Sequence, residues 1–174
     1  MQSAHIALVY KVDALDLVFV ARLHRLMHEV INDVALGTLE SMEKPPRRTW
    51  ARHLPLVSAE IEGAEAGSLS HYLKLIVSTV ASVGNVEHFL VNVVSSLFVS
   101  LLTSGRESRS ADEAEGHGID QDSGLSVDLG PNLRRIAQAF AEHGRSGSIV
   151  VKEGETGRSV TVTFLPDDNA QRRS

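Results

Sequence analysis

Apolar positions follow two different spacings along the first part of the chain, and each spacing predicts a different element. Positions 5–12 are rich in β-branched and aromatic residues, which is typical of a strand. Apolar residues then recur at steps of three and four from Leu15 to Val34, so they share one face of a helix. Asp13 can cap this helix, and Gly37 is its expected stop. The pattern therefore begins with a strand and a long helix.

Two further extended segments are predicted after a loop at residues 38–53, where adjacent prolines forbid a regular helix. Apolar and polar residues alternate over 57–61, which indicates a strand. Residues 69–77 fit either a strand or a helix with one polar stripe, because periodicity does not separate the two for a short apolar run. The Gly-rich turn at residues 63–68 favours a β-hairpin.

The most apolar stretch is expected to form a helix over residues 86–103, with Asn85 as its cap and Glu87 as its only formal charge. A transmembrane helix needs about 20 largely apolar residues. The charge-free part, residues 89–102, is shorter and contains an asparagine and several serines. A buried helix is therefore the favoured interpretation, and a membrane span is the alternative.

Large apolar side chains cover more than one face of this predicted helix, so a single sheet would bury only part of them. Each large side chain left exposed forfeits about 1.5–3 kcal/mol. This loss favours burial against a second subunit in a homo-oligomer. The residues expected at that interface are Phe89, Val93, Leu97, Phe98 and Leu101.

The last part of the chain predicts a helix and a β-hairpin. Pro131 suits the first turn of the helix and Gly144 its end. An apolar run, a Gly-rich turn and then an alternation of apolar residues with threonine over 160–164 predict the hairpin, which Pro166 ends. The expected fold class is α+β, with a mixed or mainly antiparallel sheet packed with helices in the order β-α-β-β-α, followed by a C-terminal helix–β-hairpin unit.

The 174 residues carry a net charge of −5, and the acidic residues are unevenly distributed along the chain. Residues 104–128 hold seven acidic against two basic side chains and few large apolar ones, so they bury too little surface to offset their ordering entropy. We expect an α+β domain at 1–103, an acidic flexible linker at 104–128, a helix–hairpin unit at 129–166 and a frayed tail at 167–174. The absence of cysteine excludes disulfides and Cys-ligated metal sites, and it fits the cytoplasm.

Histidine is the first candidate for site chemistry. His24 and His28 are spaced four apart on the first helix and could bind a metal ion together. However, Arg25 stands where the two-histidine zinc motif carries glutamate, and no third ligand is near in the sequence. We therefore interpret both as surface histidines and expect no metal or cofactor. No nucleophile–histidine–acid set or paired carboxylates can be assembled, so an enzyme is not expected.

A basic loop with one aromatic residue is the second candidate. Cations that hold phosphates beside a ring that stacks a base are typical of nucleic-acid contact. The residues in question are Lys44, Arg47, Arg48, Trp50 and Arg52. The part of the chain before residue 104 is slightly acidic, however, and Trp50 can equally anchor the loop to the core.

The stretch LPLVSAEIEGAEAGSLSHYLKLIV, residues 54–77, together with the helix before it, resembles a loose group of uncharacterised bacterial and phage-borne proteins. The resemblance covers about half of the chain, and the turn Gly67-Ser68 is its sharpest point. It implies a strand–helix–hairpin–helix layout and no particular activity.

The function expected from these patterns is non-catalytic. We expect an interaction, regulatory or assembly module that self-associates through the apolar helix and binds an unidentified protein partner in the cytoplasm. The first alternative is a nucleic-acid-binding accessory protein that uses the loop from Lys44 to Arg52. The second is a membrane-peripheral protein.

Overall fold

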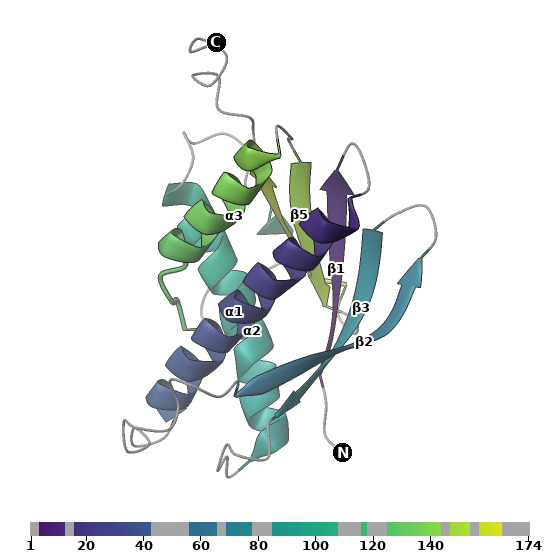
Figure 1. Ribbon diagram of the computed structural model, residues 1–174. Helices are drawn as coiled ribbons and strands as arrows, with labels where there is room; N and C mark the ends of the chain where they lie inside the picture. Colours follow the sequence, from purple (N-terminus) through teal and green to yellow (C-terminus); the bar gives the residue numbers. More distant parts are fainter. Residues whose placement is uncertain are drawn as a thin grey trace.

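The computed structural model describes residues 4–12, 16–42, 56–65, 69–77, 85–107, 116–117, 125–143, 147–153 and 157–164. These residues form three helices and one antiparallel sheet, which confirms the α+β class (Figure 1). The elements are β1 (Ala4–Val12), α1 (Leu17–Met42), β2 (Val57–Glu65), β3 (Leu69–Val77), α2 (Val86–Glu107), β4 (Gly116–His117), α3 (Gly130–Glu142), β5 (Gly147–Glu153) and β6 (Ser159–Phe164).

The strands lie in the order β2-β3-β1-β5-β6-β4. Residues 69–77 form a strand, which decides between the two interpretations left open by periodicity; β3 pairs with β1 on one side and with β2 on the other. β5 pairs with the other side of β1 over seven residues, from Ile6 with Glu153 to Val12 with Gly147. The predicted C-terminal helix–hairpin unit thus shares one continuous sheet with the N-terminal elements.

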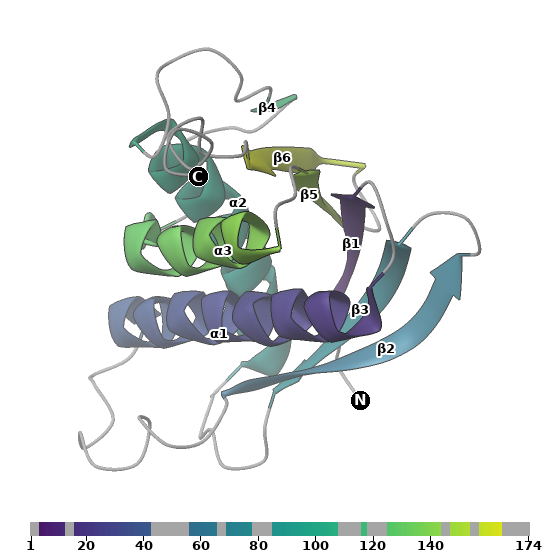
Figure 2. The same cartoon turned by 45° about the horizontal axis from the view of Figure 1, so that its top comes forward.

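All three helices lie on the same face of the sheet (Figures 1 and 2). Alternate residues of β1 point toward them, and Ile6, Leu8 and Tyr10 are almost fully buried. Apolar side chains from the helices and the helix-facing sides of the central strands form one hydrophobic core. Since alternate side chains of a strand point to opposite faces, the other half of each strand's side chains must point away from this core.

Helix α2 lies at the centre of this core, where other parts of the same chain cover the residues expected at an interface. The residues assigned to a second subunit, Phe89, Val93, Leu97, Phe98 and Leu101, are each at most 2% exposed within the single chain. A sheet alone would have left part of this helix uncovered. In the structure α1 and α3 cover further sides, as Figure 2 shows. The segment Val86–Ser104 is long and apolar enough to cross a membrane, but most of it is buried in the protein.

Polar side chains cap the N-terminal ends of α1 and α2. The Oδ1 atom of Asn85 accepts a hydrogen bond from the backbone N–H of His88 at 3.0 Å, which confirms Asn85 as the cap of α2. Asp16 caps α1 by accepting from the N–H of Val18 at 2.9 Å. The predicted cap Asp13 lies outside the described residues. α1 also continues to Met42, past the stop that Gly37 was expected to impose.

Gly37 lies inside α1 because another segment packs directly on its backbone. A Cβ atom placed on Gly37 would lie 2.8 Å from Cγ2 of Val127. Carbon atoms in favourable contact lie about 3.5–4.0 Å apart. The glycine therefore serves close packing against residues 125–127 rather than a helix end.

Residues 125–129 are held along α2 by three serine side chains, which we call the serine ladder. The hydroxyl oxygens of Ser96, Ser100 and Ser104 accept hydrogen bonds from the backbone N–H groups of Leu125, Val127 and Leu129, at 3.1, 2.8 and 2.9 Å. Four residues of a helix rise about 6 Å and two residues of an extended chain span about 6.6 Å, so the two spacings nearly match.

The serine ladder places both ends of the predicted linker differently from the sequence analysis. Residues 104–107 belong to α2, and residues 125–128 lie against it. Composition gave no sign of this, because the contacts use backbone N–H groups of the segment and serines of the helix. Residues 108–115 and 118–124, like the predicted tail at 167–174, lie outside the described part of the chain.

We predict that Ser100→Ala destabilises the protein by about 1–3 kcal/mol, because it leaves the N–H of Val127 without its acceptor in a part-buried place. Chemical denaturation would measure the change. Thr103→Ala is the matched control, since this exposed hydroxyl donates only to the carbonyl of Val99 in its own helix. Equal effects of the two substitutions would contradict a role for the serine ladder.

We also predict that Gly37→Ala gives no gain in stability, although alanine is favoured over glycine in a helix by about 1 kcal/mol. The new methyl group meets Val127, and overpacking cancels the gain. In a Val127→Ala background the same substitution should stabilise the fold by about 1 kcal/mol. A double-mutant cycle measured by denaturation tests this, and additive effects would contradict it.

Candidate binding face

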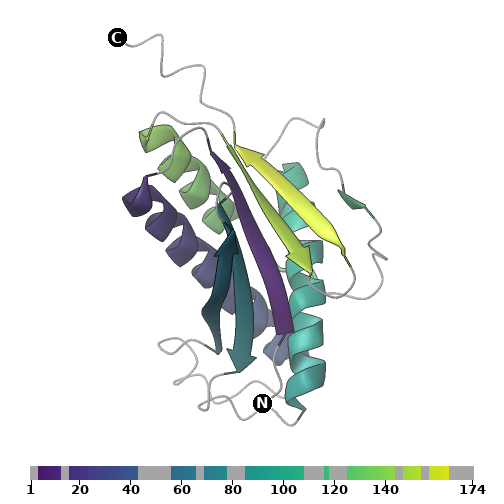
Figure 3. The same ribbon diagram turned by 90° about the vertical axis from the view of Figure 1, so that its right-hand side faces the viewer.

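The face of the sheet turned away from the helices is the candidate functional site, and we call it the open face. Figure 3 looks onto it, with no helix in front of the strands. Strand alternation and burial place on it the described side chains of Ser58 and Glu60 from β2, Tyr72, Lys74 and Ile76 from β3, His5, Ala7, Val9 and Lys11 from β1, Ser148, Val150 and Lys152 from β5, and Ser159, Thr161 and Thr163 from β6.

The charge on the open face is opposite in sign to that of the chain. Lys11 and Lys152 are exposed, and Lys74 is half-buried. Glu60 is the only acid among the described side chains of this face, and it lies on the outermost strand directly opposite Lys74. The whole chain carries −5. Positive charge is thus concentrated on one surface of an acidic protein, which favours the approach of an anionic partner to that surface.

The apolar side chains at the centre of the open face, which we call its floor, are largely buried. Ala7 and Val150 are only 7% and 5% exposed, and Val9 lies half-buried beside Val150. Tyr72 stands beside this floor at 42% exposure. β1 pairs Ala7 with Tyr72 on one side and with Lys152 on the other, so the three residues lie in one row across the sheet.

This face was not predicted from the sequence. The period-two alternation of β1 and β3 does place Lys11, Tyr72 and Lys74 opposite the apolar positions of their strands. However, the alternation does not say that every helix packs on one side, nor that β5 joins β1. Lys152 therefore came next to Ala7 only through the tertiary pairing.

The two candidate metal ligands have structural neighbours in α1. The ring of His24 packs edge-on against Tyr10, with centroids 5.1 Å apart. His28 Nε2 lies 3.3 Å from the side-chain nitrogen of Asn32. Within the described part of the chain, no three histidine, aspartate or glutamate side chains group as metal ligands would. The structure thus does not bring a third ligand to this pair among the residues it describes.

Asn32 itself bridges two elements. Its Nδ2 atom donates to the backbone oxygen of Val57 at 3.0 Å, and its Oδ1 atom accepts from the N–H of Val57 at 3.0 Å. The side chain amide therefore pairs with the start of β2 in the way a neighbouring strand would.

The predicted basic loop lies outside the described residues. This applies to Lys44, Arg47, Arg48, Trp50 and Arg52 alike, so nucleic-acid contact by this loop stays a prediction.

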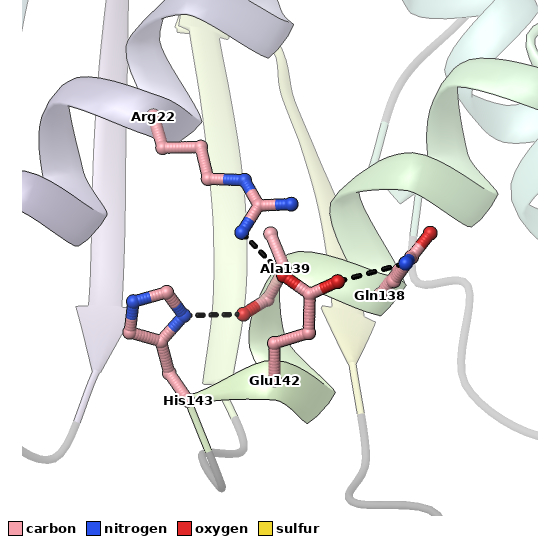
Figure 4. A network of polar contacts seen from close by, with 5 residues as sticks. All are labelled: Arg22, Gln138, Ala139, Glu142 and His143. Carbon is pink, nitrogen blue, oxygen red and sulfur yellow. Dashed lines mark hydrogen bonds and ion pairs between the residues drawn. The ribbon is translucent and has the colours of Figure 1, made fainter.

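A polar cluster lies between α1 and α3 (Figure 4). Arg22 of α1 donates to Oε2 of Glu142, while Gln138 donates to Oε1 of the same carboxylate at 2.7 Å. His143 Nδ1 donates to the carbonyl oxygen of Ala139 at 2.9 Å. The side chain of Glu142 is exposed, and its two oxygens already have protein donors.

The electrostatics of this cluster indicate a structural role. The hydrogen bond from Arg22, then that from Gln138, lowers the pKa of the Glu142 carboxyl below its ordinary value of 4.5. A general acid needs the opposite shift. Farther along the same helix pair, Arg135 bonds Glu29 and Asn132 donates to Asp33. These contacts fasten α3 to α1.

We predict that Glu142→Gln lowers stability at neutral pH and that the difference from the wild type vanishes in acid. Because the folded-state pKa is lowered, the contribution is complete above pH 4.5 and is lost as the pH falls through the lower folded value. Thermal unfolding between pH 7 and acid measures it. Glu40→Gln, at an exposed position of α1, is the control. The same pH dependence in both variants would show that Arg22 is not the cause.

Comparison with known proteins identified no relative of this chain. No protein-family model matches the chain, and neither a curated protein nor a solved structure shows a significant match to it.

Proposed function

We propose that this protein is a non-catalytic binding module whose open face holds an anionic partner. One observation carries the proposal: the face left uncovered by the helices bears Lys11, Lys74 and Lys152, although the chain as a whole is acidic. A partner with negative charge would be drawn to this face and repelled by much of the remaining surface.

Burial supports this choice of surface over the apolar helix. Self-association through α2 would require Phe89, Leu97 or Phe98 to leave the core, and truncating or exposing such side chains costs several kcal/mol. The open face can bind a partner without any rearrangement of the core. The proposal therefore keeps the expected interaction role and moves it from the helix to the sheet. The cytoplasmic location stays a prediction.

Energetics set the strength and the salt dependence of this binding. An exposed ion pair contributes about 0.2–1 kcal/mol. Three lysines acting alone would then give weak binding that salt suppresses, since the Debye length is about 8 Å at physiological ionic strength. Contact with the apolar floor formed by Ala7, Val9 and Val150 would add little to this, because Ala7 and Val150 are already only 7% and 5% exposed.

Binding to two model polyanions, poly-L-aspartate and an oligothymidylate, tests the proposal. We expect both to bind at low salt and to weaken as salt is added. Lys152→Glu should reduce affinity by about fivefold, equivalent to roughly 1 kcal/mol, because it reverses one contacting charge. Titration calorimetry or fluorescence anisotropy would measure this.

Arg134→Glu is the matched control for that experiment. It makes the same change of charge at an exposed position of α3, in the helix layer. Its affinity should stay close to that of the wild type. Equal losses in the two variants, or no binding of either polyanion by the wild type at low salt, would overturn the proposal.

A further inference from the structure

We infer that the anionic partner is a single strand of nucleic acid, with one base stacked on Tyr72 and its backbone held by the lysines of the open face. This inference rests on the proposed function. It uses residues different from the basic loop that the sequence analysis singled out.

The row Tyr72–Ala7–Lys152 has the dimensions for one nucleotide. Neighbouring strands lie about 4.8 Å apart, so the backbones of Tyr72 and Lys152 are roughly 10 Å apart across β1. Ala7 lies between them, carries only a methyl group and is 7% exposed. Lys74 is two residues from Tyr72 on the same side of β3, about 6.6 Å along the strand.

The chemistry of this row separates a nucleic acid from an acidic peptide. Both would use the lysines. Only a nucleic acid also offers flat rings that stack on an exposed tyrosine. Hydroxyl groups complete the arrangement, because Ser159 pairs with Lys152 and Thr161 with Val150 on the next strand. Serine and threonine hydroxyls commonly donate to phosphate oxygens.

The same geometry favours a single strand over a duplex. In a duplex the base faces are stacked on one another, and a side chain of a sheet surface reaches only the edges and the backbone. A single strand can turn its bases outward onto a protein ring. With one exposed aromatic ring described on this face, stacking adds to an electrostatic track and gives little sequence preference.

The test is fluorescence anisotropy with a labelled oligothymidylate, at low salt, on the full chain. Tyr72→Ala should weaken binding roughly tenfold, because stacking of a base on an aromatic ring is lost. Tyr72→Phe keeps the ring and should bind like the wild type. Since Tyr72 is exposed, both variants should fold, and circular dichroism would verify this. Binding of poly-L-aspartate should be unchanged by Tyr72→Ala.

Three results would overturn the inference. The wild type could bind poly-L-aspartate but not the oligonucleotide, which would retain the proposed function with an acidic protein as its partner. Tyr72→Ala could bind the oligonucleotide as tightly as the wild type does. A hairpin duplex of equal charge could bind as well as the single strand. Failure of both polyanions to bind would instead reject the proposed function itself.

Discussion

Burial of helix α2 is the constraint on which the rest of the structure depends. The helix is apolar on most of its circumference, so one layer of protein cannot satisfy it. The sheet covers one side, α1 and α3 cover others, and residues 125–129 close a further side through the serine ladder. Every helix is therefore drawn to the same face of the sheet, and this leaves the opposite face open. The candidate binding surface is thus a by-product of how α2 is covered.

The serine ladder shows how a helix this apolar can still hold an extended segment in register. Ser96, Ser100 and Ser104 are all buried, yet each has a backbone N–H group to bond. A buried hydroxyl without a partner is unfavourable, and so is a buried N–H group without an acceptor. Each hydrogen bond of the serine ladder provides a partner for both groups. Gly37 contributes from the other helix by letting Val127 approach.

Local features were predictable from the sequence, and features that depend on tertiary contacts were not. The strands other than β4, which falls in the predicted linker, and the cap at Asn85 follow from alternation and side-chain chemistry, so their prediction was confirmed. The continuation of α1 through Gly37 depends on Val127, which is 90 positions away in the chain. The hydrogen bonds of the α2 serines likewise depend on residues 125–129, which lie more than 20 positions farther along the chain. The open face needed two facts that periodicity does not contain: the side on which the helices pack and the neighbours of β1.

The pairing of Asn32 with Val57 has a consequence for the solution behaviour of the protein. β2 is the outermost strand on its side of the sheet, and a bare outer strand can recruit another chain and begin a fibre. The amide of Asn32 forms hydrogen bonds with both the N–H and the C=O of Val57. An incoming strand therefore cannot pair with these backbone groups at the start of β2. The irregular register between Ile61 and Gly63, and the charge of Glu60, hinder pairing farther along. These features hinder the addition of a strand from another chain at this edge, and so they hinder polymerisation.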